Sequence, residues 1–539
     1  MGERQALRPL EPVPPGRAEV TCALVYPNRL ALAAANLGFQ TLYALLNREG
    51  WLCHRAAADR PRTLEAGRDL GAYDVVAASL SFEGDYPAFL ELLRDARIPL
   101  RSGDRGASHP LVLVGGVAPT LNPEPLAPFC DIVFLGEAEA GLAGLLAFLR
   151  DHRELPRSER LRALAGAGLA GVYVPGLQDP AAGFRAERVW ARVPWDPART
   201  RFLVPDDPFG GAYLLEIGRG CPHACRFCAA GYATRPFRPL PLTALLPWVG
   251  FGAEKAGKVG FVAAAVSDHP GFTDLARAAL EAGAGFSVSS FRAENLSAEA
   301  ADLLVRGGLK TLTVALEAGS PRLRALLGKR ITEEDLLRAA RSAGEAGIPN
   351  LRIYAMVGLP TETDEDVDAL ADAAERARVA LGRGQVTVSA APFVPKPHTP
   401  LQWEPAPAEA LVRARIRRLQ ARCGRVRGVR AVAETPKWSR LQALWSRGGR
   451  AVADLLEQGV GSADWRAVLR SPLARRELDE PRDPDAPLPW DFLGGVPDRA
   501  HLLRERAAAL AGSPPVPCRP GTCTACGVCE SGGEAGQRR

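Results

Sequence analysis

The 539-residue sequence lacks long apolar segments. It has no uninterrupted apolar run of about 18 residues, the length that suggests a membrane-spanning helix. Its first residues, MGERQALRPLEPVPPGRAE, are charged and proline-rich, without the apolar core of a signal peptide. We therefore expect a cytoplasmic protein with no membrane segment, in a compartment where thiols stay reduced.

The sequence also lacks a strong charge imbalance and any long internal repeat. A formal net charge of +6 is mild for this length and identifies no partner. With 47% hydrophobic and 24% charged residues, the composition is that of a soluble globular protein. The length predicts two to four domains.

Cysteine is scarce but clustered. Three of the eleven cysteines lie in RGCPHACRFC, as Cys221, Cys225 and Cys228, with the spacing C-x3-C-x2-C. Three soft thiolates suit three corners of a [4Fe–4S] cluster and leave the fourth iron open. The alternative is zinc, but a structural zinc site needs four ligands, and His223 is only two residues from each neighbouring cysteine.

Strand and helix patterns alternate in two series, which predicts an α/β protein. The first series has strand patterns at 20–30, 73–81, 109–119 and 130–139. It predicts a flavodoxin-like, doubly wound parallel sheet over residues 20–160. A connector follows over 161–205. Ligands would bind beyond the strand ends, near Ser79, Gly115 and Gly116.

The second series predicts a partial (β/α)6 barrel over residues 206–405. Its strand patterns lie at 213–219, 258–267, 285–292, 311–319, 351–359 and 386–394. The cysteine cluster follows the first of these strands, at the end where a barrel places its chemistry. A basic helical region, 406–512, and a cysteine-rich tail, 513–539, complete the expected domains.

Several blocks beyond the cysteines carry a family resemblance. The sequences EIGRGCPHACRFCAAGY, LTVALEAGSPRLRALLGKRITEEDL, IYAMVGLPTETDEDV and FVPKPHTPLQW are similar to those of the radical S-adenosylmethionine (SAM) superfamily. Together with YPNRLALAAANLGFQTLYALLN, NPEPLAPFCDIVFLGEAE and CRPGTCTACGVC, they resemble the largely uncharacterised subgroup with an N-terminal cobalamin-binding-type domain. The resemblance covers about nine-tenths of the chain.

The resemblance implies how SAM would bind. SAM would chelate the open iron through its amino and carboxylate groups and be cleaved reductively to a 5′-deoxyadenosyl radical. Phe227 would pack on the adenine, and Ser289 and Arg292 would meet the methionine carboxylate. Glu317 would accept from the methionine amine. The alternative is that Arg292 and Glu317 form an ordinary structural salt bridge.

The motif VGLP resembles an adenine-contacting turn, with Gly358 and Pro360 as the candidate contacts, although it would also suit an ordinary turn. The sequence departs from the family where a Gly-Gly-Glu segment is expected, because AAAVSDHPG stands there. The contact to the SAM amine would then come from Ser267 or Asp268, or be absent.

The N-terminal domain departs from cobalt-ligating cobalamin domains. These carry Asp-x-His-x-x-Gly after the first strand, where this chain has YPNRLALAAANLGF, and no histidine lies near any of the four strand ends. Cobalamin would have to bind through Ser79, Ser81, Gly115 and Gly116 without a protein ligand to cobalt. Otherwise the domain is a scaffold or a lid over the substrate.

A second cysteine cluster ends the sequence. Cys518, Cys523, Cys526 and Cys529 have the spacing C-x4-C-x2-C-x2-C, which favours an auxiliary [4Fe–4S] cluster over zinc. Such a cluster would relay electrons or bind substrate. The alternative is a structural metal site that only orders the tail.

The remaining candidates concern substrate and partners. Residues 411–450 hold twelve Lys or Arg and one acidic residue, which suits either RNA binding or a solvated helix face. Lys396 and His398, after the sixth strand pattern, are candidates for substrate contact or proton transfer. His398 would also suit a structural role.

Taken together, these features predict a radical SAM enzyme of unknown substrate, reduced by a donor such as flavodoxin or ferredoxin, with methyl transfer as an extension if cobalamin binds. One alternative is a tRNA methylthiotransferase, although the sequence has no appended RNA-binding β-barrel. Another is a non-catalytic iron–sulfur protein that docks a partner through the basic region.

Overall fold

The computed structural model describes residues 7–11, 18–48, 50–204, 206–519 and 523–529. These residues form two compact units, and the chain passes between the units more than once. Unit 1 holds the described residues up to Gly211, together with Leu444–Glu477 and Asp485–Gly495. Unit 2 holds Ala212–Ala443, Leu478–Pro484 and the described residues from Val496 onward.

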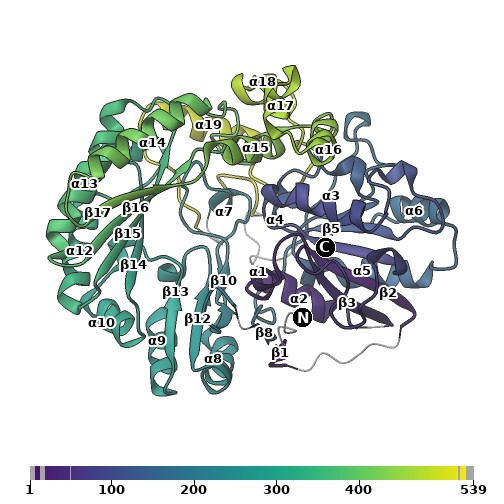
Figure 1. The fold of residues 1–539 in the computed structure, drawn as a ribbon, viewed down its shortest axis with the longest axis horizontal. Helices are drawn as coiled ribbons and strands as arrows, with labels where there is room; N and C mark the ends of the chain where they lie inside the picture. The colour runs from purple at the N-terminus through teal and green to yellow at the C-terminus, as the bar shows by residue number, and fades with distance from the viewer. Residues whose placement is uncertain (1–6, 12–17, 49, 205, 520–522, 530–539) are drawn as a thin grey trace. The chain divides into compact units, whose positions relative to one another are not determined.

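Unit 1 is built on a six-stranded sheet with the strand order β3-β2-β4-β5-β6-β7 (Figure 1). All neighbours are parallel except β6 and β7. The strands are β2 (Val20–Tyr26), β3 (Trp51–Ala57), β4 (Val75–Ser79), β5 (Leu111–Gly115), β6 (Ile132–Phe134) and β7 (Val172–Tyr173). Runs such as VVAAS and LVLVG are buried almost throughout, as parallel strands covered on both faces require. A short pair, β1 (Arg8–Pro9) with β8 (Phe202–Leu203), lies outside this sheet.

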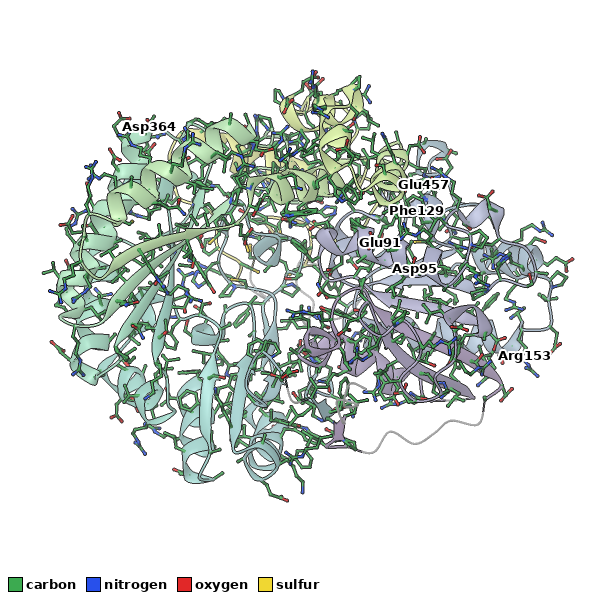
Figure 2. All side chains as sticks on the ribbon, viewed as in Figure 1. Glu91, Asp95, Phe129, Arg153, Asp364 and Glu457 are labelled. Atoms are coloured by element: carbon green, nitrogen blue, oxygen red, sulfur yellow. The ribbon has the colours of Figure 1, made fainter. Side chains whose placement is uncertain are left out.

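The helices of unit 1 come from two distant parts of the sequence. They are α1 (Leu30–Ala34), α2 (Leu37–Leu45), α3 (Tyr86–Asp95), α4 (Val117–Leu121), α5 (Ala138–Asp151), α6 (Arg157–Gly166), α16 (Val452–Ser462) and α17 (Trp465–Arg470). Helix α16 packs on α3. Beside this contact, the Arg101 guanidinium lies 5.6 Å from the centroid of the Phe129 ring and donates to Glu457 Oε2 at 2.8 Å. Figure 2 labels Phe129 and Glu457 close together.

Unit 2 contains seven parallel strands in two sheets. One sheet has the order β13-β12-β9 and the other β14-β15-β16-β17. The strands are β9 (Tyr213–Glu216), β12 (Lys258–Val262), β13 (Gly285–Val288), β14 (Thr311–Glu317), β15 (Asn350–Val357), β16 (Gln385–Pro392) and β17 (Val429–Ala433). The Phe291 N–H, just after β13, donates to the Thr313 carbonyl of β14 at 2.9 Å, which links the two sheets. Figure 1 shows these strands following one another in an arc.

Helices follow the strands of unit 2 and bury their apolar faces. They are α7 (Ala229–Tyr232), α8 (Leu242–Ala256), α9 (Phe272–Glu281), α10 (Ala298–Arg306), α11 (Pro321–Leu326), α12 (Glu333–Ala346), α13 (Asp364–Leu381), α14 (Glu409–Cys423) and α19 (Arg499–Leu510). Capping boxes begin α12 and α13, with Thr332 and Asp335 in the first and Thr363 and Asp366 in the second. Helices α15 (Pro436–Arg447) and α18 (Pro472–Asp479) each contain a point where the chain passes from one unit to the other.

Two strands of the larger sheets, β3 and β17, were not predicted from the sequence. Strand β3 carries His54 and Arg55, which obscure its pattern. Arg55 is nevertheless buried, because Glu65 accepts from its Nε at 2.7 Å and the rings of Tyr43 and Phe202 each lie 4.1 Å from its guanidinium. Strand β17 lies in VRAVA, within the region predicted to be a basic helix and a turn.

No helix in the described part of the chain is long and apolar enough to cross a membrane.

The segment that returns to unit 1 is held by a buried amide. Asn122 Nδ2 donates to the carbonyls of Ser446 at 3.0 Å and Gly448 at 2.8 Å, and the Asn122 residue is 2% exposed. Replacing Asn122 with alanine removes a hydrogen-bond donor from both carbonyls. Each buried polar group that loses its partner lowers the free energy of unfolding by about 1–3 kcal/mol.

We expect Asn122→Ala to lower the urea midpoint of the first unfolding transition clearly. Asn350→Ala is the matched control, since its side chain makes an exposed hydrogen bond to the Lys310 carbonyl, and its midpoint should stay near that of the parent chain. Equal midpoints for the two variants would contradict the anchoring role of Asn122.

Candidate active site

Cys221, Cys225 and Cys228 lie in one loop at the carboxyl end of β9. The loop is closed at its base by β10 (Gly218–Arg219) and β11 (Arg238–Pro239), which pair antiparallel. It ends with the Cys228 N–H donating to the Cys225 carbonyl at 2.9 Å, just before α7. The sequence thus places three thiols at the end of a strand in a parallel sheet, as predicted.

Cys225 is buried, and Cys221 and Cys228 are half-buried. Burial, together with the other cysteines of the loop, raises the pKa of Cys221 to about 12 and that of Cys228 to about 11. Such thiols stay protonated near neutral pH unless a metal site stabilises the thiolates. The donor set therefore suits a metal centre that displaces these protons.

A single metal ion fits the loop poorly. Within the described ranges, no three His, Cys, Asp or Glu side chains converge to hold one metal ion. One zinc would draw its sulfur ligands in to bonds of about 2.3 Å. A [4Fe–4S] cluster is larger, so three thiolates can bind it without converging on one point.

Arg226, between two of these cysteines, anchors the loop from inside the protein. Its side chain is fully buried and donates to the carbonyls of Ala325 at 3.0 Å and Ser513 at 2.8 Å. Its Nε also donates to Glu505 Oε2 at 3.1 Å. The sequence reasoning missed Arg226, because nothing in the motif distinguishes an anchoring arginine from an exposed one.

Phe227 and the VGLP turn meet in one apolar cluster. Phe227 and Met356 pack against a buried group that includes Leu327 and Leu359. Gly358 has a φ of +80°, and a Cβ there would lie 2.7 Å from Pro407. The structure thus brings together two candidate adenine contacts that are separated by 130 residues in sequence.

The Gly358 turn is fixed by a buried ion pair. The Gly358 N–H donates to Glu362 Oε2 at 2.7 Å, and Arg415 Nη1 lies 2.7 Å from the same oxygen. Pro360 lies between Gly358 and Glu362 in sequence and is half-buried. Glu362 and Arg415 are further residues that the sequence reasoning missed.

The end of β12 carries an acidic residue in the place of the expected Gly-Gly-Glu. Asp268 Oδ1 lies 2.8 Å from Nε2 of His223, in the cysteine loop. The backbone N–H of Arg292, after β13, donates to Ser267 Oγ at 3.2 Å. Asp268 Oδ2 and Arg292 Nε are both buried without a hydrogen-bond partner among the described residues.

Orphaned buried polar atoms of opposite type fit a bound zwitterion. Arg292 forms an ion pair with Glu294, so the salt bridge with Glu317 that the sequence left open is not the pairing that forms. Ser289, also after β13, is half-buried.

Glu317 ends β14 in an unusual conformation. Its φ is +69°, and the register with β15 shifts between Ala315 and Glu317. Lys329 Nζ lies 3.4 Å from Glu317 Oε1, and both side chains are largely buried. Burial lowers the pKa of Lys329, but Glu317 and then Cys225 outweigh it and raise that pKa overall. Lys329 is a site residue that the sequence showed only as part of the block ALLGKR.

Lys396 and His398 lie in the turn after β16. His398 is buried, with a φ of +60°, and its backbone N–H donates to Gln402 Oε1 at 2.7 Å. The Lys396 carbonyl accepts from Thr399 Oγ1 at 2.8 Å. These contacts show a well-fixed turn, and a catalytic role for either side chain stays a prediction.

In unit 1, the candidate ligand site lies at the carboxyl ends of β4 and β5, and the backbone is tightly packed at its glycines. Gly116 has a φ of +105°, and a Cβ there would lie 2.6 Å from the Leu80 carbonyl oxygen. Ser79 is buried, and the Leu80 N–H donates to the Gly115 carbonyl at 2.9 Å. The glycines therefore let two loops approach each other, whatever ligand the edge binds.

Part of the basic segment is paired with acidic residues in unit 2. Arg418 pairs with Asp364 at 3.0 Å and Asp368 at 2.7 Å, and Arg422 pairs with Asp372. These partners lie along α13, which packs against α14, and Figure 2 labels Asp364, the first residue of α13. Some of the positive charge that suggested RNA binding thus holds two helices together.

Two protein-family models match the chain. The model "Radical SAM proteins, N-terminal" matches residues 38–175, and "Radical SAM superfamily" matches residues 215–374. Together they cover more than half of the chain.

Curated relatives are similar over much of the same length. An uncharacterized protein of Methanocaldococcus jannaschii is 28% identical, over 71% of this chain and 79% of its own. An uncharacterized methyltransferase of Pyrococcus horikoshii is 25% identical, over 56% of this chain and 64% of its own, so the chain spans less than two thirds of that relative.

Solved structures show more distant likenesses. The radical SAM methyltransferase TsrM from Kitasatospora setae, with cobalamin and a [4Fe–4S] cluster bound, is 16% identical, with a TM-score of 0.49 over 92% of this chain and 99% of that one. The cobalamin-dependent SAM radical enzyme OxsB is 19% identical, with a TM-score of 0.47 over 66% and 52%. TM-scores below 0.5 are too low to establish a shared fold.

The matched family models, the three-thiol loop and the orphaned polar atoms beside it lead to one conclusion: the chain belongs to the radical SAM superfamily, whose enzymes work with a [4Fe–4S] cluster and SAM.

Proposed function

We propose that this chain cleaves SAM reductively at a [4Fe–4S] cluster held by Cys221, Cys225 and Cys228, and that it acts on a substrate whose identity is open. The observation that carries the proposal is the position of three partly or fully buried thiols in one loop, beside orphaned polar atoms that follow adjacent strands. When bound, the cluster supplies the electron that splits SAM into methionine and a 5′-deoxyadenosyl radical. A donor such as flavodoxin or ferredoxin would supply that electron.

The polar residues would hold the methionine part of SAM. Asp268 Oδ2 accepts from the ammonium group, and Arg292 Nε donates to the carboxylate, with Ser289 as a further contact. Glu317 is a second acceptor for the ammonium, and Lys329 Nζ lies 3.4 Å from its Oε1. Buried, charge-assisted hydrogen bonds of this kind fix orientation as well as affinity.

The apolar cluster would hold the adenine. Phe227 and Leu359 contribute an apolar wall, and the Gly358–Pro360 turn would present backbone to the base, while the missing side chain at Gly358 leaves room for Pro407. Arg226 does not touch SAM in this proposal. It positions Cys225 and Phe227, its two neighbours, by fixing the backbone between them.

We also propose that unit 1 is a flavodoxin-like, cobalamin-type module and that methyl transfer is the reaction to test. Numbered along the chain, its first five parallel strands have the order 2-1-3-4-5, which is the flavodoxin order. At their carboxyl edge, Asn36 Nδ2 donates to Ser81 Oγ at 3.1 Å, and Asn28 Nδ2 lies 3.4 Å from Asp85 Oδ1. The name of the Pyrococcus horikoshii relative supports methyl transfer.

No imidazole lies at this edge among the described residues to ligate cobalt. His54 lies within β3, where Nδ1 contacts the Tyr73 hydroxyl at 2.8 Å, and His109 precedes β5. A corrinoid would therefore be held by polar side chains and backbone, and its cobalt would take no protein histidine.

The first prediction concerns SAM cleavage. Anaerobically reconstituted and reduced protein should form 5′-deoxyadenosine from SAM, whereas Cys225→Ala should form none and lose about four irons. Cys423→Ala, a buried cysteine in α14, is the control and should behave like the parent chain. Loss of activity in both variants would point to misfolding rather than to the cluster. An intact cluster that neither cleaves nor binds SAM would favour the non-catalytic alternative.

The second prediction concerns Asp268. The amide of Asp268→Asn can still accept from His223, but it removes the charge at the orphaned oxygen. We expect SAM to bind about tenfold or more weakly, since a hydrogen bond to a charged group contributes about 1.5–3 kcal/mol. Iron content should not change. Asp274→Asn is the control, because Asp274 forms only an exposed ion pair on α9. Equal SAM affinities for the two variants would rule out the assigned contact.

The third prediction concerns the corrinoid. Full-length protein mixed with hydroxocobalamin should retain it through gel filtration, with an absorption spectrum that shows no nitrogen ligand from a histidine. Asn36→Ala should weaken the retention of cobalamin, because it removes the hydrogen bond to Ser81. Asn47→Ala is the control and should retain cobalamin, because the Asn47 side chain accepts from the Cys53 N–H in β3 instead. Absence of retained cobalamin in the parent chain would leave unit 1 as a scaffold.

A further inference from the structure

The four tail cysteines gather at one place in unit 2. The Cys523 N–H donates to the carbonyl of Arg519, the residue after Cys518, at 3.1 Å, and Cys526 and Cys529 follow within the next six residues. Cys526 is 6% exposed, and its carbonyl accepts from the Asp498 N–H at 2.9 Å. This hydrogen bond attaches the set to the start of α19.

One of these sulfurs already accepts a hydrogen bond from the backbone. The Ala525 N–H donates to Cys523 Sγ at 3.5 Å. Backbone N–H groups that point at sulfur stabilise thiolates, and they tune the potential of iron–sulfur clusters. After Cys526 the chain turns at Gly527, with a φ of +72°, where a Cβ would collide with the Asp498 carboxylate.

A buried cation lies beside α19, the helix to which the set is attached. Arg235 is 3% exposed, and its Nη2 is buried without a hydrogen-bond partner among the described residues. Its Nη1 lies 3.4 Å from Nε2 of His501, in the first turn of that helix. Four thiolates around a [4Fe–4S] core in its 2+ state carry a net charge of minus two. A buried negative charge is costly unless a cation compensates it, and the Arg235 guanidinium would do so.

The segment that leads to these cysteines runs along the first cysteine loop. Arg226 Nη2 donates to the Ser513 carbonyl at 2.8 Å, and the Val516 N–H donates to Glu505 Oε1 at 3.1 Å. The Cys518 N–H then donates to the Pro222 carbonyl at 3.0 Å. Pro222 follows Cys221, and consecutive Cα atoms are about 3.8 Å apart. One ligand of each set therefore lies almost in contact with the other set.

We infer that Cys518, Cys523, Cys526 and Cys529 hold an auxiliary [4Fe–4S] cluster that passes electrons to the cluster of the first loop. This inference rests on the proposed function. One electron enters the auxiliary cluster from a low-potential one-electron donor of the ferredoxin or flavodoxin class and reduces it from 2+ to 1+. The same electron then passes to the first cluster, and the auxiliary cluster returns to 2+. No bond forms or breaks and no proton moves in the relay. Zinc has no redox chemistry and could not take this role.

The test compares full-length reconstituted protein with Cys526→Ala and Cys529→Ala. Cys529→Ala is included because Cys529 is more exposed and its loss disturbs folding less. Cys423→Ala is the matched control. We expect about eight irons in the parent chain and the control, and about four in each tail variant. One zinc with four irons in the parent chain would overturn the inference.

The relay is tested with two reductants. With reduced flavodoxin, we expect 5′-deoxyadenosine formation to fall at least tenfold in the tail variants. With titanium(III) citrate, a small reductant that reaches the first cluster directly, the rates should stay within about twofold of the parent chain. Equal losses with both reductants would mean that the tail only supports the fold, and no loss with either would also overturn the relay.

Spin coupling separates this inference from the proposed function. In the fully reduced parent chain, the electron paramagnetic resonance signals of two neighbouring clusters should broaden one another, and Cys529→Ala should remove the broadening. Coupling without any SAM cleavage would uphold the paired clusters and refute the proposed function. Two uncoupled signals would refute the neighbouring placement even if SAM is cleaved.

Discussion

The site in unit 2 depends on one buried cation. The Arg226 guanidinium has no access to water, so its charge must be compensated inside the protein. It is compensated by Glu505 of α19 and by carbonyls at the end of α11 and at the start of the tail. Because the same residue separates two cysteine ligands, the position of the cysteine loop is determined by elements from three parts of the chain.

This dependence explains which parts of the site could be predicted from sequence. The thiols were predicted because their spacing within one loop is a local property. Phe227, Glu317 and Gly358 were proposed from the family resemblance, and their roles stay predictions. Arg226, Lys329 and Glu362 were missed, since each acts through a partner far away in sequence, and a single sequence contains no sign of such pairing.

The fold shows the same division between local and distant information. The apolar runs of β2, β4, β5 and β6 identified most of the N-terminal sheet, and six strand patterns identified six of the seven strands in the two sheets of unit 2. Strand β3 was missed because its buried arginine looks exposed in sequence. The basic character of α14 favoured RNA as much as a helix face, because its acidic partners lie about 50 residues earlier, on α13.

The chain crosses between the two units five times, and this has a consequence for biosynthesis. The ribosome releases the strands of unit 1 first, but the helices that complete it emerge only after most of unit 2 has been made. Domains generally fold in order of synthesis. Unit 1 must instead wait with an unfinished surface, so premature termination anywhere before Gly495 would leave both units incomplete, and neither half of the gene encodes a self-sufficient product.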